Sequence, residues 1–364
     1  MLSEISLLSA AQRIDFDWDE VNPEKVYARY QVLSHTDDQA VVLIASPHDA
    51  YVFFDTITHV HREDLEHFRL RPYRDWFVGA FALPRGLVMS AGLIPAGKPI
   101  STEREQWIKH IETATALDQE SERVGNLTCL RVPASGEVPA APYPVRKPQH
   151  HTLFDIAAPD GHRFSVEAWA DITGGPSLLL LTDGNRYVNS YPFAPQCSTA
   201  YFSTTNAQDR GTLLCNAAVL EPFLADQLLP WLHGLGVNMR PADTAIAGAS
   251  FGGLAAARTV RRRPDLVENA IVQSASFWFD PEELAAWQKP LAGPPRRIFH
   301  EIGTLETALS SSTPTKKDSM GSVNQEFARC LQSPHQVSRQ FVGGHDYAPW
   351  REGIIAGIQH LKLR

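Results

Sequence analysis

Short apolar runs alternate with helical patterns after about residue 150, and this alternation restricts the possible folds strongly. Ser177–Leu181 is an apolar run of the kind expected for a strand that is covered on both faces. Strands that alternate with helices favour a mostly parallel sheet with helices on both of its faces. Further strands are predicted at Thr199–Ser203, Thr244–Ala247, Ala270–Gln273, Arg297–Ile302 and Val337–Val342, and helices at Ala217–Leu235, Leu254–Arg262 and Glu352–Leu361.

The first part of the chain has a different pattern, in which apolar runs follow one another with turn residues between them. A helical stretch at Glu103–Thr115 and a proline-rich linker at Val132–Pro144 come after these runs. We therefore expect residues 1–150 to form an antiparallel, immunoglobulin-like β-sandwich with its linker, and residues 151–364 to form a second domain. The predicted strands of the sandwich are Val26–Leu33, Ala40–Ala45, Tyr51–Thr58 and Trp76–Leu83.

The composition is that of a globular protein, with 43% hydrophobic and 20% charged residues. The formal net charge of −8 argues against nonspecific binding of nucleic acid, which needs a basic surface. Four cysteines without C-x-x-C spacing are expected to be reduced thiols, and we expect no bound metal or cofactor. We find no signal peptide or membrane-spanning run, so we expect a cytoplasmic monomer or homodimer with no membrane partner.

The segment Gly248-Ala-Ser-Phe-Gly-Gly253 carries the strongest chemical signal in the chain. It follows a predicted strand and opens a predicted helix, which is the context of a nucleophile elbow. Side chains at Gly248 and Gly252 would collide with the neighbouring strand and helix, and Ser250 would sit in strained backbone with its hydroxyl outward. The alternative is an ordinary glycine-rich turn. We predict an α/β-hydrolase domain in residues 151–364, with Ser250 as its nucleophile.

A serine hydroxyl becomes a good nucleophile only when a base takes its proton. In this type of fold the base comes last in chain order, after the acid. His345 is the candidate, because Val342-Gly-Gly-His-Asp346 directly follows the last predicted strand. The alternative is a plain loop histidine. The other histidines of this half fit less well, since they lie in surface-like turns, at helix ends or inside a strand: His162, His233, His335 and His300.

The third member of such a site is a carboxylate that orients the imidazole and stabilises the imidazolium. Glu306 follows the predicted strand Arg297–Ile302 and is our candidate. Glu301 and Asp346 are rivals, and a Ser–His dyad without an essential acid remains an alternative.

An oxyanion hole needs two preorganised N–H donors. The N–H of Phe251, the residue after the nucleophile, is one candidate. The second is the N–H of Asn185, in the segment Thr182-Asp-Gly-Asn-Arg186 that follows a predicted strand. A simple turn is the alternative for that segment.

Several of these segments together resemble the enterochelin (ferric enterobactin) esterases, of the esterase D branch of the α/β-hydrolases. The resemblance spans roughly residues 165–362. No single motif establishes it, but the order and spacing of the motifs together do. Cytosolic members of this family carry an N-terminal sandwich domain, as expected here. The segments are Leu181-Thr-Asp-Gly184, Asn206-Ala-Gln-Asp-Arg210, Gly248-Ala-Ser-Phe-Gly-Gly-Leu254, Gln273-Ser-Ala-Ser-Phe-Trp278, Glu301-Ile-Gly303, Gly343-Gly-His-Asp346 and Trp350-Arg351.

The resemblance implies a catalytic triad of Ser250, Glu306 and His345. It implies that Arg210 contacts the substrate, with Arg186 and Arg351 as weaker candidates. Trp278 and Trp350 are predicted either to stack on substrate rings or to pack in the core. The implied substrate is a cyclic tri-ester siderophore with catechol-type acyl groups, with iron only as part of the substrate. Such a complex is anionic, which suits arginine ligands.

The sequence therefore predicts a carboxylic ester hydrolase that cleaves a siderophore and so releases iron inside the cell. The alternative enzyme is an esterase D-type carboxylesterase or acyltransferase on feruloyl or other acyl esters. The same three residues would serve both reactions, so the sequence does not separate them. A third interpretation is a binding module, in which the sandwich docks a glycan or siderophore and the second half has lost its activity.

Overall fold

The computed structural model describes residues 10–97, 100–135, 137, 143–289, 297–307 and 319–364. The chain divides into two units. The first contains Met1–Pro142 together with Gly303–Ala308 and Phe341–Pro349, and the second contains Tyr143–Ile302, Leu309–Gln340 and Trp350–Arg364. All of residues 151–364 were expected in one domain, so the two short segments are an unexpected part of the first unit.

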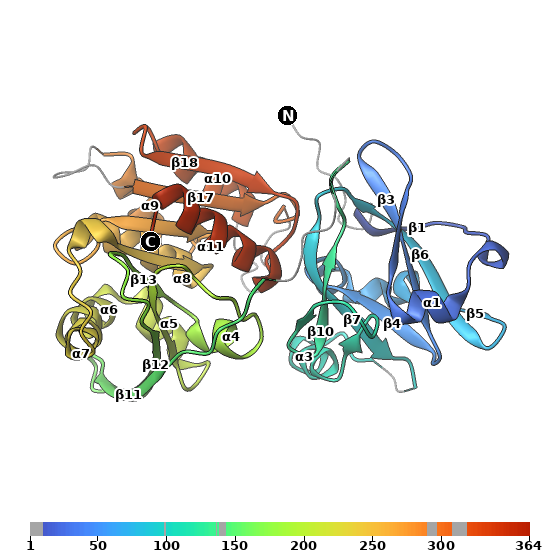
Figure 1. Ribbon diagram of the computed structural model, residues 1–364, viewed down its shortest axis with the longest axis horizontal. Helices are drawn as coiled ribbons and strands as arrows, with labels where there is room; N and C mark the ends of the chain where they lie inside the picture. Colours follow the sequence, from blue (N-terminus) through green and yellow to red (C-terminus); the bar gives the residue numbers. More distant parts are fainter. Residues whose placement is uncertain (1–9, 98–99, 136, 138–142, 290–296, 308–318) are drawn as a thin grey trace. The chain divides into compact units, whose positions relative to one another are not determined.

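Two antiparallel sheets form the first unit (Figure 1). One has the order β1 (Gln12–Arg13), β6 (Trp76–Pro84), β3 (Gln39–Ser46), β2 (Gln31–Ser34), with β5 (Arg71–Tyr73) paired to β6. The other has the order β4 (Ala50–Phe54), β7 (Val88–Pro95), β10 (Leu127–Arg131), β9 (Arg123–Val124), with β8 (Thr115–Ala116) paired to β7. Both sheets contribute to one apolar core, in which Phe54 of one sheet meets Phe81 of the other with ring centroids 5.3 Å apart. The predicted antiparallel sandwich is confirmed.

One predicted strand of this unit is wrong over half of its length. The strand expected at Val26–Leu33 is helix α1 (Pro23–Ala28) followed by the short strand β2. Asn22 caps the helix by accepting a hydrogen bond from the Glu24 N–H, and Pro23 occupies the first helical turn. The strand expected at Tyr51–Thr58 ends earlier, at Phe54. The remaining helices of the unit are η2 (Trp18–Glu20), α2 (Ile57–Val60), η3 (Arg62–Phe68) and α3 (Arg104–Glu112).

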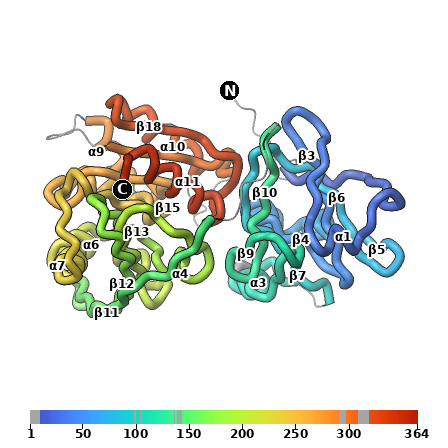
Figure 2. Tube along the Cα trace, in the orientation of Figure 1, coloured from blue at the N-terminus to red at the C-terminus, as the bar shows by residue number. Residues whose placement is uncertain are grey.

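An eight-stranded sheet forms the centre of the second unit. Its order is β11 (His150–Ala157), β12 (Arg163–Asp171), β14 (Ser198–Thr204), β13 (Leu178–Leu181), β15 (Thr244–Ala249), β16 (Asn269–Gln273), β17 (Arg297–Gly303), β18 (Gln336–Phe341). The pairs from β14 to β17 are parallel, whereas β11 and β12 are antiparallel. The neighbours β13 and β15 can be followed in Figure 2.

Helices accompany the parallel strands, as an α/β-hydrolase requires. The nine residues Gly252–Val260 of helix α8 (Phe251–Arg262) are buried, so this helix belongs to the core of the unit. The helix predicted at Ala217–Leu235 is a helical run with a π-helical centre, made of α6 (Ala217–Pro222), η4 (Phe223–Leu228) and α7 (Leu229–Gly234). The others are α4 (Gly184–Asn189), α5 (Asp209–Cys215), η5 (Pro241–Asp243), α9 (Pro281–Trp287), α10 (Met320–Cys330) and α11 (Tyr347–Leu361). The predicted fold class is confirmed.

The proline-rich linker predicted at Val132–Pro144 lies partly outside the described residues. Within the part of the chain that is described, no helix has the length and apolar character needed to cross a membrane.

Candidate active site

Ser250 lies in a sharp turn between strand β15 and helix α8. Its backbone angles are φ 59° and ψ −120°, a conformation that costs a residue with a side chain about 1–3 kcal/mol. The turn is held from both sides, because the Ser250 N–H donates to the Gln273 carbonyl at 3.0 Å and the Ser250 carbonyl accepts from the Ser276 N–H at 3.0 Å. A strained serine fixed at the start of a helix is the arrangement of a nucleophile elbow.

The two glycines of the elbow are required by space. A Cβ on Gly248 would lie 2.3 Å from the Thr182 hydroxyl oxygen, and a Cβ on Gly252 would lie 2.2 Å from the same atom. Thr182 directly follows strand β13, which is paired to β15. A Cβ on Gly248 would also lie 2.5 Å from the carbonyl carbon of Gly252 in helix α8, so the collisions expected with the neighbouring strand and helix are both found.

A second serine, Ser276, contacts the candidate nucleophile. The hydroxyl oxygens of Ser250 and Ser276 are 3.2 Å apart, and Ser276 is fully buried. Ser276 was not among the predicted site residues, although it lies in the segment Gln273–Trp278 that carries part of the resemblance. Ser276 thus orients the Ser250 hydroxyl in this structure.

His345 and Glu306 form a hydrogen-bonded pair in the first unit. The His345 Nδ1 lies 2.7 Å from the Glu306 Oε2, and the Glu306 side chain is 1% exposed, against 37% for His345. The Gly303 N–H donates to the other carboxylate oxygen at 3.1 Å, which fixes the carboxylate. A carboxylate that accepts the Nδ1–H makes Nε2 the basic nitrogen of the ring.

The rival carboxylates have other contacts. Glu301 is fully buried and accepts hydrogen bonds from the Gln273 amide at 2.7 Å and from Arg339 at 2.9 Å. Asp346 accepts hydrogen bonds from Ser90. Glu306 is the candidate acid that this structure shows bonded to the His345 ring.

His300, the histidine expected inside a strand, is a packed core residue. It is fully buried, and its ring nitrogens lie 2.9 Å from the Ser338 hydroxyl and 3.1 Å from the Asn324 side-chain oxygen. Burial lowers the pKa of His300 to about 4. A neutral histidine in this position supports the sheet and does not take part in the candidate site.

The segment predicted to supply the second oxyanion donor makes a tight turn into helix α4. Asp183 has a left-handed backbone, with φ 55° and ψ 34°, and a Cβ on Gly184 would lie 2.6 Å from the Phe202 backbone nitrogen. The Asn185 side chain accepts a hydrogen bond from the Ser203 hydroxyl at 2.9 Å. Asn185 is thus held against strand β14, and its N–H lies in the first turn of a helix, where backbone donors lack helical partners.

Arg210 connects this turn to the elbow. It donates from Nε to the Asp183 Oδ1 at 2.5 Å and from Nη2 to the Asp183 Oδ2 at 2.7 Å. Its guanidinium carbon also lies 5.5 Å from the centroid of the Phe251 ring. The Asp183 side chain is 6% exposed and that of Arg210 is 27% exposed, so the pair is largely withdrawn from water. Arg210 therefore links the two segments that carry the candidate oxyanion donors.

The other predicted substrate contacts differ in exposure. Arg186 is exposed and Trp278 is partly exposed, in an aromatic cluster with Phe251 and Phe279. Trp350 is 2% exposed and donates its indole N–H to the Ser274 hydroxyl at 3.0 Å. Arg351 is also buried. Trp350 is thus packed in the core, which is one of the two alternatives predicted for it, and the substrate contacts predicted for Arg186, Arg351 and Trp278 stay predictions.

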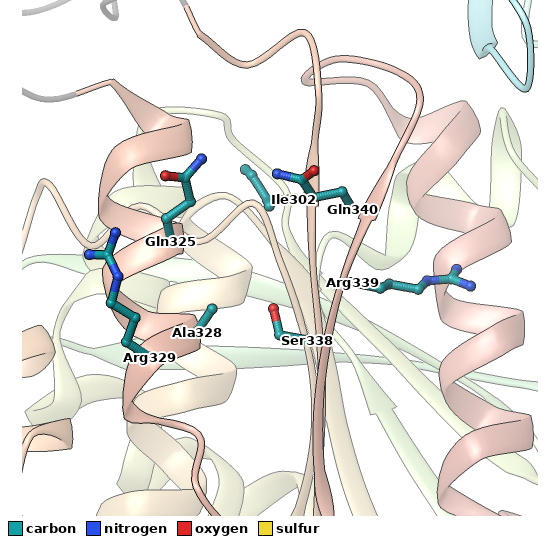
Figure 3. A pocket seen from close by; sticks show the side chains of 7 residues that line it. All are labelled: Ile302, Gln325, Ala328, Arg329, Ser338, Arg339 and Gln340. Atoms are coloured by element: carbon teal, nitrogen blue, oxygen red, sulfur yellow. The ribbon is translucent and has the colours of Figure 1, made fainter. Parts of the chain in front are cut away.

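A surface pocket lies apart from these residues, between helix α10 and strands β17 and β18 (Figure 3). Its volume is about 290 Å³, and its lining includes Gln325, Ala328 and Arg329 of α10 and Ser338 and Gln340 of β18. None of the predicted site residues lines it. No group of three or more histidine, cysteine, aspartate or glutamate side chains able to hold a metal occurs among the described residues.

Comparison with known proteins supports the resemblance found in the sequence. Residues 187–361 match the family model Esterase, described as "Putative esterase". The chain is 27% identical over 224 residues to the iron(III) salmochelin esterase of Escherichia coli and 29% identical over 226 residues to the iron(III) enterobactin esterase of Dickeya dadantii. These alignments cover 57% and 50% of this chain and 50% and 47% of the relatives, so the chain spans about half the length of the curated relatives it matches.

Solved structures share the fold over nearly the whole chain. The enterobactin esterase from Shigella flexneri superimposes with a TM-score of 0.71 at 20% identity, covering 93% of this chain and 97% of that one. The ferric enterobactin esterase from Salmonella typhimurium gives a TM-score of 0.68 at 20% identity, with 94% and 98% covered. At this level of identity the likeness establishes the two-part fold.

Proposed function

We propose that the chain is a serine esterase, which the match of residues 187–361 to the Esterase family model supports. The observation that carries the proposal is the strained elbow that presents Ser250, with Ser276 at its hydroxyl. The hydrogen-bonded pair His345–Glu306 supports it, because a serine esterase needs a base whose tautomer is fixed.

The proposed roles follow the chain order of the fold. Ser250 follows strand β15 directly, Glu306 comes after strand β17, and His345 comes after strand β18. The backbone bonds from the Ile298 N–H to the His335 carbonyl and from the Thr304 N–H to the Phe341 carbonyl have the same offset, so β17 and β18 run parallel. The carboxyl ends of parallel strands meet at one edge of a sheet, which is where ligands bind in open α/β sheets.

The proposed mechanism is acyl transfer in two steps. The Ser250 oxygen forms a bond to the ester carbonyl carbon while His345 Nε2 takes its proton, and the N–H groups of Phe251 and Asn185 stabilise the oxyanion. The alcohol then leaves with the proton from His345, which leaves an acyl group on Ser250. Water, deprotonated by His345, releases the acid and restores the serine. This sequence uses protein groups alone, so we propose that no cofactor is needed.

We propose that the substrate is the tri-ester backbone of a catecholate-type siderophore, with iron entering only as part of it. Two curated relatives are an iron(III) salmochelin esterase and an iron(III) enterobactin esterase, which supports this substrate class. The cluster of Phe251, Trp278 and Phe279 has ring centroids 5.1 to 6.0 Å apart beside Ser250 and would suit aromatic acyl groups. The site of action proposed for this reaction is the cytoplasm.

A second candidate is a carboxylesterase or acyltransferase on feruloyl or other acyl esters, because the same aromatic cluster would accept a feruloyl ring. Incubation of the enzyme with a catecholate tri-lactone, with and without iron, and with a methyl feruloyl ester separates the two by mass spectrometry of the products. We expect linear and monomeric products of the tri-lactone. Turnover of the feruloyl ester alone would favour the second candidate. Failure of a fluorophosphonate probe to label Ser250 would favour a binding module.

A further inference from the structure

The loop that carries His345 is attached to the N-terminal sandwich along its length. The Val88 N–H, at the start of strand β7, donates to the Val342 carbonyl at 3.2 Å. The loop that carries Glu306 is attached to the sandwich as well. The Leu305 N–H donates to the Gly343 carbonyl at 2.9 Å, and the Leu305 side chain lies in the apolar core of the sandwich. Both segments that supply the His345–Glu306 pair are therefore packed on the sandwich.

The residue before His345 packs on Thr56 without any spare space. A Cβ on Gly344 would lie 2.2, 2.4 and 2.5 Å from the Oγ1, Cβ and Cγ2 atoms of Thr56. Gly344 has no left-handed backbone that would require glycine for another reason. Thr56 itself has φ 63°, which is strained for a residue with a side chain, in the turn after strand β4. The glycine before His345 is thus required by the closeness of Thr56.

The residue after His345 is held by Ser90 of strand β7. The Asp346 carboxylate accepts hydrogen bonds from the Ser90 N–H at 2.5 Å and from the Ser90 hydroxyl at 2.8 Å. Asp346 is 2% exposed and Ser90 is fully buried. Hydrogen bonds to a buried carboxylate are stronger than those between neutral groups, so this contact is a firm attachment.

One further ionisable group faces this contact from the sandwich. Asp55, in the same turn as Thr56, donates its backbone N–H to the Ser90 carbonyl at 3.0 Å. Burial and the Asp346 charge raise the pKa of Asp55 well above its ordinary value, and burial likewise raises the pKa of Asp346. The mutual repulsion of Asp55 and the buried Asp346 costs free energy, and the fold keeps this pair beside the candidate base.

We propose that Thr56 and Ser90 of the N-terminal sandwich are positioning residues for the general base, because they fix the residues on either side of His345. The proposal rests on the function above only in taking His345 as the base. It gives the sandwich a part in the chemical step besides any part in substrate docking. Displacement of a catalytic group by about 1 Å lowers a rate by about 100-fold, so loss of this attachment should act on kcat.

A steric rescue tests the contact at Gly344. We expect Gly344→Ala to lower kcat at least about tenfold with KM changed less than about threefold, because the added methyl pushes the loop from Thr56. Thr56→Gly removes the atoms that would collide and suits the positive φ at that position. The double variant should recover kcat to within about threefold of the wild type. A fully active Gly344→Ala enzyme, or a double variant no better than Gly344→Ala, would overturn the proposal.

A second pair of variants tests the contact at Asp346 without depending on a substrate. Ser90→Ala removes a buried hydroxyl that bonds within the His345 loop, whereas Ser46→Ala removes a buried hydroxyl that bonds to the backbone of His48 in the same sandwich. The readout is the downfield proton resonance of the His345 Nδ1–H that is bonded to Glu306. We expect Ser90→Ala to weaken or lose this resonance and Ser46→Ala to keep it, at matched melting temperatures.

The same two variants distinguish failure of the proposed esterase function from failure of the positioning role. An enzyme that cleaves no ester and whose Ser250 reacts with no fluorophosphonate refutes the proposed function, while the resonance still reports on the loop. An unchanged resonance in Ser90→Ala, with kcat equal to that of Ser46→Ala, refutes the positioning role.

Discussion

Replacement of Arg210 by alanine tests whether this arginine supports the fold of the site or only contacts substrate. Arg210 makes two parallel hydrogen bonds to Asp183, whose side chain is 6% exposed. Arg210→Ala would leave a buried carboxylate without its cation. The same change would remove the cation from the face of Phe251, the residue after the nucleophile.

The expected cost follows from the burial of the two partners. Breaking a fully buried ion pair by removing one partner costs about 3–5 kcal/mol. The Arg210 side chain is 27% exposed, so water partly solvates the pair, and we expect about 2–4 kcal/mol. With a urea m-value near 2 kcal/mol/M, the midpoint of unfolding should fall by about 1–2 M.

Urea denaturation followed by circular dichroism measures this loss. The matched control is Arg163→Ala, which breaks the exposed pair of Arg163 with Asp155, whose side chains are 63% and 61% exposed, and should cost less than about 1 kcal/mol. Asp183→Asn combined with Arg210→Ala leaves no unpaired charge and keeps a residue that tolerates the left-handed backbone. The double variant should therefore lose about 1–3 kcal/mol less than the sum of the two single changes.

The reasoning fails if Arg210→Ala is as stable as Arg163→Ala. A raised KM with unchanged stability and unchanged kcat would instead assign Arg210 to the substrate alone. Arg210→Lys should fall between wild type and alanine, because lysine cannot reproduce the two parallel bonds.

Two predictions concern the dependence of stability on pH. The pKa of Asp55 is raised in the folded state, so its contribution to stability is present below about pH 4 and is lost as the pH rises through the folded pKa. Asp55→Asn should therefore be more stable than the wild type near pH 7. Chemical denaturation should show this difference vanishing toward pH 4. The pKa of His300 is lowered from 6.5 to about 4, so as the pH falls the unfolded chain takes up the proton before the folded protein does. The free energy of unfolding should therefore fall by about 3 kcal/mol as the pH drops from 6.5 to 4. In calorimetry, His300→Asn should show a flatter dependence on pH over that range, and an unchanged slope would contradict this.

Much of the fold was predictable because its signals are local. Central strands of the second unit such as β13 and β15 are runs of buried residues, and the glycines of the elbow leave room for Thr182. The error at Val26–Leu33 is local too: the Asn22-Pro23 helix start was overlooked in favour of β-branched and aromatic residues. Short strands such as β9, with two residues, have too little pattern to be found.

The candidate site was predictable where chain order carries information. The order of serine, acid and histidine in this fold led to Glu306, and the structure shows its bond to His345. The roles of Ser250, His345 and Glu306 stay predictions. The contact between Ser90 and Asp346 was missed because the two residues are 256 positions apart and no motif connects them. The sequence left open whether Trp350 stacks on a substrate or packs in the core, because burial depends on which other elements cover the residue.

The central claim is that Ser250 is the nucleophile of an esterase, and the most direct test is the rate of tri-lactone hydrolysis by Ser250→Ala. Product release would be followed by mass spectrometry, with circular dichroism showing that the variant is folded. Loss of the nucleophile of a serine hydrolase lowers kcat by about 10⁴-fold or more, so we expect no product above the uncatalysed level over the time of many wild-type turnovers. Hydrolysis by Ser250→Ala at the wild-type rate would contradict the account.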